Sequence, residues 1–275
     1  MAPHTATGTP YEDRHAFVTG GGRGIGLACA HALLLGGARV TVAGRDMATL
    51  AQARTQLLAL AGDADGADIA DARIHVQQLD VTDEASVQAA FAGAVQRFGR
   101  VDILVNNAGQ ARPAPFLKTD AAHWQQMLAV NLGGVFLCSQ AALPGMLEAG
   151  WGRIVNVAST AGLVGYRYVS AYVAAKHGVI GLTRALALEV AAKGVTVNAV
   201  CPGYTETDIV RDAVAHIAAT TGRSAAQARA ELAAANPQQR LVQSAEVAHA
   251  VAWLCLPASA AMNGQSVAVA GGEVM

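Results

Sequence analysis

Short segments rich in valine and isoleucine alternate along the chain with alanine- and leucine-rich segments of helical length. The predicted strands are residues 16–20, 39–44, 73–81, 101–109, 152–159, 194–203 and 265–271. The predicted helices between them are residues 24–37, 46–62, 84–99, 120–150, 170–192 and 244–256. Continuous apolar strands separated by crossover helices indicate a parallel sheet covered on both faces. The pattern therefore predicts an α/β fold, a single doubly wound Rossmann domain with a seven-stranded parallel sheet.

Three segments interrupt this alternation. Residues 1–13 lack the basic start and the apolar run of a signal peptide, so we expect a flexible tail ahead of a domain at 14–275. Residues 62–71 (GDADGADIAD) are predicted to form a surface insertion. Residues 204–243 follow the sixth predicted strand, at the edge where open α/β sheets bind ligands. This position favours a helical substrate lid, with an oligomerisation arm as the alternative.

Composition excludes several other classes of protein. The 275 residues are 53% hydrophobic and carry a formal net charge of −1, which excludes disorder over most of the chain. With 19 basic and 20 acidic residues there is no electrostatic footprint for nucleic acid. Aromatic residues make up 5% of the chain, which argues against a base-stacking surface. We therefore expect no nucleic-acid partner.

The cysteines and the apolar segments both bear on the cellular compartment. None of the four cysteines belongs to a CxxC pair, and scattered cysteines in an apolar chain usually pack as buried thiols. The most apolar predicted helices are interrupted by Asn131, Gln140, Pro144 and Glu189, so no stretch of about 18 apolar residues predicts a membrane span. We expect a cytoplasmic protein that is not bound to a membrane.

A glycine cluster joins the first predicted strand to the first predicted helix. Gly20, Gly24 and Gly26 lie in the segment TGGGRGIG, residues 19–26. Glycines at such a turn permit positive φ angles and let the backbone approach a pyrophosphate closely. The helix that follows offers free backbone amides and a partial positive charge at its N-terminus. The cluster therefore predicts a dinucleotide-binding site.

The glycine spacing is the first of several motifs that occur in a recognisable order. Gly20-x3-Gly24-x-Gly26 resembles the TGxxxGIG motif of the short-chain dehydrogenase/reductase family, and NNAG at 106–109, Ser159, the YxxxK pair of Tyr172 and Lys176, and Pro202-Gly203 follow. Over residues 14–272 the chain is identified as a member of this family. Within it, the chain resembles the 3-oxoacyl-thioester reductases and the 3-hydroxybutyrate dehydrogenases. The resemblance implies hydride transfer between a nicotinamide cofactor and a secondary alcohol or ketone.

The residue types of the YxxxK pair and Ser159 suit this chemistry. Tyr172 and Lys176 are four residues apart, so they share one face of a helix. A free tyrosine has a pKa of about 10, and a nearby ammonium group is expected to lower that pKa. Ser159, at a strand end, is placed to donate a hydrogen bond to the substrate oxygen as charge develops there. Tyr172 then takes the alcohol proton in oxidation and returns it in reduction.

The resemblance also implies roles for residues around this set. Lys176 would hold the nicotinamide ribose, and Asn131, in the long predicted helix, would position a water in a proton relay. Asp80 would accept from the adenine amino group, and Asn107 would contact the adenosine ribose. The expected cofactor contacts are Gly20, Arg23, Gly24, Ile25, Gly26, Arg45, Asp80, Val81, Asn107, Gly109, Tyr172, Lys176, Pro202, Gly203, Thr205 and Thr207.

Cofactor choice depends on the end of the second predicted strand. Gly44 occupies the position where users of NAD typically present an acid for the ribose 2′-hydroxyl. Arg45 is suited to a 2′-phosphate, with help from Arg23 in the glycine loop. Asp46 is expected to cap the following helix rather than reach the ribose. NADP(H) is favoured, and NAD(H) is the alternative.

The expected substrate pocket contains Ala161, Val169 and Tyr204. In the hydroxybutyrate dehydrogenases, polar and cationic groups stand at the first two positions and hold a small carboxylate. Such a carboxylate would lack partners here, and burying it unpaired is costly. We therefore expect a 3-oxoacyl thioester or a similarly bulky ketone. The alternatives are a short hydroxy acid, an alicyclic or aromatic alcohol, or a regulatory protein that binds the cofactor without turnover.

Two further expectations concern metals and assembly. The eight histidines show no HxxxH or HExxH spacing, so no metal site is expected. The predicted helices 120–150 and 170–192 carry more apolar residues than one sheet face needs, which indicates burial on a second side. In the resembling family these helices pair across two-fold axes. The sequence therefore favours a homotetramer, with a dimer as the alternative.

Overall fold

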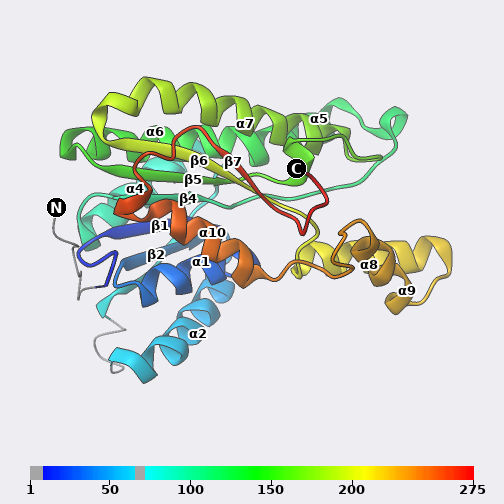
Figure 1. Ribbon diagram of the computed structural model, residues 1–275, viewed down its shortest axis with the longest axis horizontal. Helices are drawn as coiled ribbons and strands as arrows, with labels where there is room; N and C mark the ends of the chain where they lie inside the picture. Colours follow the sequence, from blue (N-terminus) through cyan, green and yellow to red (C-terminus); the bar gives the residue numbers. More distant parts are fainter. Residues whose placement is uncertain (1–8, 66–71) are drawn as a thin grey trace.

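The computed structural model describes residues 9–65 and 72–275, which form a sheet between two layers of helices (Figure 1). Within these residues the sheet has seven strands in the order β3-β2-β1-β4-β5-β6-β7, and all neighbours are parallel. The strands are β1 His15–Thr19, β2 Arg39–Gly44, β3 Ile74–Gln78, β4 Ile103–Asn106, β5 Gly152–Val157, β6 Val195–Pro202 and β7 Ser266–Val269. This order confirms the predicted Rossmann fold.

Two groups of helices cover the faces of the sheet. Helices α1, α2 and α10 lie on one face, and α4, α5, α6 and α7 lie on the other (Figure 1). Each group encloses an apolar core of its own, the first around Leu33 and Leu254 and the second around Met146 and Ile154. The helices are α1 Gly24–Leu35, α2 Met47–Asp65, α4 Glu84–Phe98, α5 Ala121–Leu128, α6 Gly134–Ala149, α7 Ser170–Val190, α8 Asp208–Thr221, α9 Ala225–Ala234 and α10 Ser244–Cys255.

Two strands are shorter than the apolar pattern predicts. The predicted strand 73–81 ends at Gln78, and the predicted strand 101–109 ends at Asn106. The residues that follow each strand leave the sheet and line a cavity at its carboxyl edge, the edge formed by the C-terminal ends of the parallel strands. The apolar pattern continues past both strand ends because these residues are still partly buried.

The predicted helix 120–150 is continuous but changes its winding. Asp120 caps α5 by accepting from the His123 amide at 2.7 Å, and a π-helical turn, Ala129–Gly133, joins α5 to α6. By length and hydropathy alone, Ala121–Ala149 could cross a membrane, with a mean hydropathy of 1.4 in its most apolar window. Core helices of soluble proteins meet the same criterion, and this helix lies against the sheet.

The predicted lid, residues 204–243, is an excursion closed at its base. The Val242 amide donates to the Tyr204 carbonyl at 2.9 Å, and the Glu206 amide donates to the Val242 carbonyl at 2.9 Å. Helices α8 and α9 project beyond the carboxyl edge of the sheet (Figure 1). Arg229 of α9 donates to the Glu206 carboxylate at 2.8 Å. The two ends of the lid are therefore bonded to each other just beyond the end of β6.

The N-terminal segment differs from the prediction of a flexible tail over residues 1–13. Residues 9–13 pack on the domain, because the Tyr11 hydroxyl donates to the Ala252 carbonyl at 2.5 Å and its amide donates to the Gly36 carbonyl at 2.8 Å. Residues 1–8 lie outside the described part of the chain. The predicted insertion at 62–71 begins within α2, which continues to Asp65, and its remainder also lies outside the described residues.

Replacing Tyr11 with phenylalanine tests this attachment. The substitution leaves the Ala252 carbonyl without its side-chain donor and should cost about 1 kcal/mol of unfolding free energy. Tyr168→Phe is the matched control, because that side chain is 63% exposed and should change stability very little. Urea denaturation of the two variants at one protein concentration measures the difference. Equal midpoints for Tyr11→Phe and the unsubstituted protein would contradict the attachment.

Candidate active site

The glycine loop is held by one side-chain amide. Asn107, directly after β4, donates from Nδ2 to the carbonyls of Thr19 and Gly20 at 3.0 Å each. A Cβ atom on Gly26 would lie 2.2 Å from the Gly20 carbonyl oxygen and 2.5 Å from this Nδ2. Gly20 and Gly24 have φ angles of +61° and +55°. The loop therefore requires glycine for space at one position and for backbone conformation at two.

This bracing changes the role expected for Asn107. The resemblance implied a contact with the adenosine ribose. In the structure the Asn107 amide group is engaged by the glycine loop, and its backbone amide donates to Thr19 Oγ1 at 3.0 Å. Asn107 still lines the neighbouring cavity, but its defined contacts hold the loop in place.

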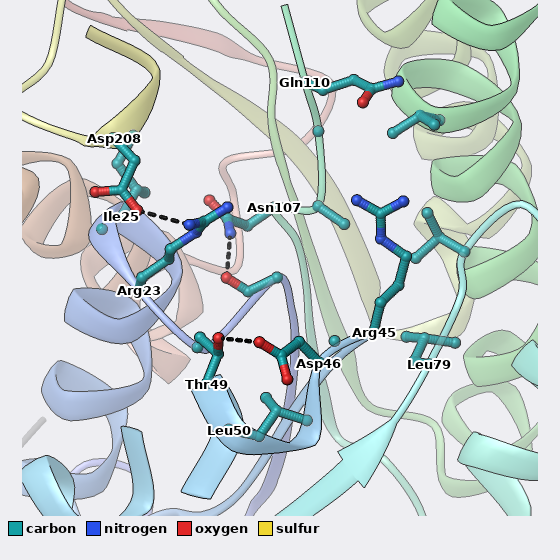
Figure 2. Close-up of a pocket in the computed structure, with 18 of the residues that line it drawn as sticks. Arg23, Ile25, Arg45, Asp46, Thr49, Leu50, Leu79, Asn107, Gln110 and Asp208 are labelled. Carbon is teal, nitrogen blue, oxygen red and sulfur yellow. Dashed lines mark hydrogen bonds and ion pairs between the residues drawn. The ribbon is translucent and has the colours of Figure 1, made fainter. Parts of the chain in front are cut away.

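A cavity of about 350 Å³ lies at the carboxyl edge of the sheet (Figure 2). This volume falls within the usual range for small-molecule sites. Among the expected cofactor residues, it is lined by Gly20, Arg23, Gly24, Ile25, Arg45, Asp80, Val81, Asn107, Gly109 and Thr207. The expected contacts that do not line it are Gly26, Tyr172, Lys176, Pro202, Gly203 and Thr205. The cavity therefore unites the residues expected at the adenosine and pyrophosphate end of a dinucleotide.

The end of β2 presents a cation to this cavity. Asp46 accepts from the Ala48 amide at 2.9 Å and from Thr49 Oγ1 at 2.6 Å, so it caps α2 as predicted. These bonds, led by that of Thr49, hold the pKa of Asp46 below its usual value. Arg45 lines the cavity, and its guanidinium has no ion-pair partner within the described part of the chain. Asp46 is thus bonded to the start of α2, whereas Arg45 is available to bind an anion in the cavity.

Arg23 is placed differently from the expectation that it assists Arg45. The two side chains lie on opposite sides of the cavity (Figure 2). Arg23 Nη1 instead lies 2.8 Å from Asp208 Oδ2 at the start of α8. The expectation of a joint site is therefore wrong for this arrangement, because the lid supplies a carboxylate that the sequence pattern gave no reason to place here. Asp212 of the lid also lines the cavity.

Asp80 and Val81 form the wall beyond β3. Asp80 Oδ1 accepts from the Thr82 amide at 2.9 Å and from Thr82 Oγ1 at 2.7 Å, and these bonds lower the pKa of the Asp80 carboxyl. Asp83 caps α4 through the Ala85 amide at 3.0 Å, as the sequence predicts. Asp80 is therefore ionised at neutral pH and faces the cavity.

Ser159 and Lys176 are fixed beside the end of β5. Ser159 Oγ accepts from the Ala161 amide at 3.1 Å, and Lys176 Nζ donates to the Val157 carbonyl at 2.9 Å. Lys176 Nζ lies 5.6 Å from the centre of the Tyr172 ring. A Cβ atom on Gly109 would lie 2.9 Å from Asn131 Oδ1 and 3.8 Å from Lys176 Nζ. The fold thus brings the four predicted catalytic residues to one place next to the cofactor cavity.

Burial sets the protonation of this group of residues. It lowers the pKa of Lys176 to about 8, since the ammonium is removed from water. It raises the pKa of Tyr172 above the ordinary value, and a hydrogen bond with Ser159 opposes that change only in part. The expectation that Lys176 lowers the Tyr172 pKa is therefore not met in this structure, because desolvation of the phenol dominates.

Asn131 lies in the π-helical turn between α5 and α6 and is fully buried. Its Oδ1 accepts from the Gln110 amide at 3.1 Å, while its Nδ2 donates to the carbonyls of Gln110 and Met127 at 2.9 and 3.0 Å. A π-helical turn shifts the backbone hydrogen bonds by one residue, and such turns are frequent at functional sites. The side chain fixes the segment after β4 to the helix.

A polar group that the sequence did not predict lies beyond Ser159. Tyr166 donates to the Glu273 carboxylate and accepts from Thr160 Oγ1 at 2.9 Å, and its ring centre lies 6.4 Å from that of Tyr204. Ala161, one of the expected pocket residues, is buried, and Val169 directly precedes α7. Tyr166 was not among the expected pocket residues. No sequence motif predicted Glu273 as a site residue, because its position depends on the path of the last residues of the chain.

A Rossmann sheet with a glycine-lined cavity and an adjacent serine, tyrosine and lysine is the architecture of NAD(P)-dependent oxidoreductases. Over residues 14–218 the chain matches the family model of the short chain dehydrogenases. The chain therefore belongs to the short-chain dehydrogenase family and is an NAD(P)-dependent oxidoreductase. Within the described residues no group of three or more histidine, cysteine, aspartate or glutamate side chains is placed to hold a metal ion.

Individual relatives are similar over nearly the whole chain. The putative ketoacyl reductase 1 of the granaticin polyketide synthase from Streptomyces violaceoruber is 40% identical over 98% of this chain and 97% of its own. A D-beta-hydroxybutyrate dehydrogenase from Rhizobium meliloti is 36% identical over 94% of this chain and 97% of its own. A crystal structure of an actinorhodin polyketide ketoreductase with NADPH has a TM-score of 0.88 and 38% identity, covering 97% and 99% of the two chains. Both subgroups that the sequence resembles are thus represented.

Replacing Gly26 with alanine tests the cofactor loop. The added methyl group would collide with the Gly20 carbonyl and with Asn107, and such overpacking costs about 1–3 kcal/mol. We expect the Kd for NADPH, measured by its fluorescence, to rise about tenfold or more. Gly145→Ala is the matched control, because its methyl group would meet only Arg100 at an ordinary 3.4 Å. Unchanged NADPH affinity in Gly26→Ala would contradict the account of the loop.

Proposed function

We propose that the protein is an NADP(H)-dependent ketoreductase that reduces a 3-oxoacyl thioester or a similarly bulky ketone. The observation that carries the proposal is the group of Ser159, Tyr172 and Lys176 beside a cavity into which Arg45 is presented. Similarity to a ketoacyl reductase and to a ketoreductase with NADPH supports the same reaction and cofactor. A regulatory protein without turnover would have no need of the complete group with Asn131.

The nicotinamide, when bound, supplies the hydride for the carbonyl carbon. In the proposed reaction the Ser159 hydroxyl donates a hydrogen bond to the carbonyl oxygen as negative charge develops on it. Tyr172 then transfers its phenolic proton to that oxygen. Lys176 holds the nicotinamide ribose, and its cationic form stabilises the phenolate that Tyr172 becomes. Asn131 fixes the segment after β4 and positions the water that returns a proton.

The protonation of Tyr172 favours reduction at neutral pH. Burial keeps its pKa above the usual value, so the phenol carries the proton that a reduced ketone needs. Oxidation of an alcohol requires the phenolate, which forms only as the pH rises. The protonated phenol thus suits the reductive direction that we propose.

The side chain of Tyr172 is the direct test of this proton path. Tyr172→Phe keeps the ring and removes the hydroxyl, so kcat for ketone reduction should fall at least about 100-fold. NADPH absorbance over time measures the rate, and NADPH fluorescence should report nearly unchanged cofactor binding. Substantial ketone reduction by this variant would exclude Tyr172 as the proton donor.

The apolar environment of the expected pocket supports the substrate class. Ala161 is buried next to Ser159, and Val169 precedes the helix that carries Tyr172. Neither side chain can pair with a carboxylate, which is why we place 3-oxoacyl thioesters ahead of short hydroxy acids. Short hydroxy acids are the second candidate, because a D-beta-hydroxybutyrate dehydrogenase is among the relatives.

Arg45 is expected to decide between the two nicotinamide cofactors. Arg45→Ala removes a charge-assisted contact to a 2′-phosphate, so KM for NADPH should rise by about tenfold or more while KM for NADH changes little. Arg23→Ala is the comparison, because Arg23 lies across the cavity and should affect both cofactors alike. A wide preference for NADH in the unsubstituted enzyme would overturn the assignment.

The apolar surfaces of α6 and α7 support an assembly of copies. Phe136 and Leu147 on α6 are 48% and 38% exposed, and Leu188 on α7 is 82% exposed. Large apolar side chains on helices that already cover a sheet indicate contact with a second copy. We propose a homotetramer of two dimers, with a dimer through these helices as the alternative. The four cysteines are buried free thiols, in keeping with a cytoplasmic location.

Multi-angle light scattering tests the assembly. The chain has a mass of 28.0 kDa, and the tetramer should give a mass four times larger. Leu188→Glu introduces a charge on the exposed face of α7 and should shift the mass towards smaller species. A monomer mass for the unsubstituted protein would contradict the proposed assembly, and a dimer mass would confine it to one interface.

A further inference from the structure

The structure assigns a role in substrate selection to Glu273. We propose that its carboxylate faces the substrate, accepts a hydrogen bond from a hydroxyl group remote from the reacting ketone, and disfavours an anionic group at that same position. This inference rests on the proposed ketoreductase function and deepens it. Among the bulky ketones of the proposed function, it predicts a preference for those that carry a remote hydroxyl group over those that carry a carboxylate there.

The position of Glu273 is defined by a turn of two glycines after β7. Gly271 and Gly272 have φ angles of +61° and +95°, and the Glu273 amide donates to the Ala270 carbonyl at 3.1 Å. Gly271 lies against the base of the lid, where a Cβ atom would fall 2.1 Å from Asn236 Oδ1. This turn keeps the chain at the carboxyl edge of the sheet, beside the lid.

Gly203 makes room for the carboxylate at the end of β6. A Cβ atom on Gly203 would lie 2.6 Å from Glu273 Oε2 and 3.2 Å from the Ala270 side chain. The glycine of the Pro202-Gly203 motif is therefore the point at which the C-terminal segment reaches the start of the lid. The next residue along the chain is Tyr204, one of the expected pocket residues.

Contacts through Tyr166 connect Glu273 to the segment after β5 and to the expected pocket residue Tyr204. Tyr166 donates to the carboxylate and accepts from Thr160 Oγ1, and Thr160 directly follows Ser159. The Tyr204 ring packs edge-on against Tyr166 with 6.4 Å between ring centres. The carboxylate is thus connected through Tyr166 and Thr160 to the serine that is expected to bind the substrate oxygen.

The charge of Glu273 is not neutralised by the protein. Within the described residues, no lysine or arginine forms an ion pair with it, and the side chain is only partly exposed. Tyr166 supplies one hydrogen bond, whereas a carboxylate offers about four acceptor positions. Repulsion between this charge and a substrate anion is strong where water is partly excluded. A substrate hydroxyl, by contrast, gains a charge-assisted hydrogen bond.

Three cyclohexanones of matched shape separate these effects. The ketones are 4-hydroxycyclohexanone, 4-methylcyclohexanone and 4-oxocyclohexanecarboxylate, each assayed with NADPH. In the unsubstituted enzyme, kcat/KM should be highest for the hydroxyl compound and lowest for the carboxylate. In Glu273→Gln the ratio of the hydroxyl compound to the carboxylate should fall by about tenfold or more, mainly through KM. The methyl compound should change little in either form.

Two further variants control for misfolding and for the loss of a carboxylate anywhere on the protein. Tyr166→Phe removes the hydrogen bond that shares the Glu273 charge, so the same ratio should rise instead of fall. Glu148→Gln makes the identical chemical change at an exposed site near the end of α6 and should leave the ratio unchanged. NADPH fluorescence titration confirms that each variant still binds the cofactor.

The possible results distinguish this inference from the function on which it rests. An unchanged ratio in an active Glu273→Gln enzyme, or equal shifts in the Glu273 and Glu148 variants, overturns the role of Glu273 and leaves the ketoreductase function standing. If the unsubstituted enzyme reduces none of the three ketones and does not reduce a 3-oxobutanoyl thioester either, the result contradicts the ketoreductase function and the inference that rests on it.

Discussion

The side-chain amide of Asn107 joins the end of β4 to the glycine loop after β1, and the arrangement of the site depends on this contact. The two bonds to Thr19 and Gly20 hold the loop open towards the cavity. Gly26 must lack a side chain for the same reason, because the amide occupies the space. The segment after Asn107 leads to Gln110, whose backbone is bonded by Asn131. The short segment from Asn107 to Gln110, bonded at its two ends, thus links the glycine loop to the long helix.

Burial gives the neighbouring catalytic group its proposed direction. Parallel strands place the ends of β4, β5 and β6 at one edge, so residues distant in sequence meet there. The Lys176 ammonium loses hydration and keeps one bond, to the Val157 carbonyl, which is why its pKa falls to about 8. The Tyr172 phenol loses hydration as well and retains its proton. A buried phenol that keeps its proton suits donation of that proton to a ketone.

The sequence predicted those features that arise from local patterns. The parallel sheet follows from the alternation of strands and helices, and the glycine loop, the Asp46 and Asp83 caps and the YxxxK pair are each encoded within a few residues. Contacts between distant segments could not be predicted in this way. The pairing of Arg23 with Asp208 needs the path of the lid, and the position of Glu273 needs that of the C-terminal turn. The raised pKa of Tyr172 likewise depends on how deeply the phenol is buried.

The central claim is that hydride passes directly from the nicotinamide to the substrate carbon while the enzyme supplies only a proton. NADPH deuterated on both faces of the nicotinamide C4 tests it most directly when it is incubated with a ketone substrate in ordinary water. The account predicts one deuterium at the carbinol carbon of every product molecule, detected by mass spectrometry and NMR, and none on the hydroxyl. An unlabelled product, or deuterium released to water, would contradict it.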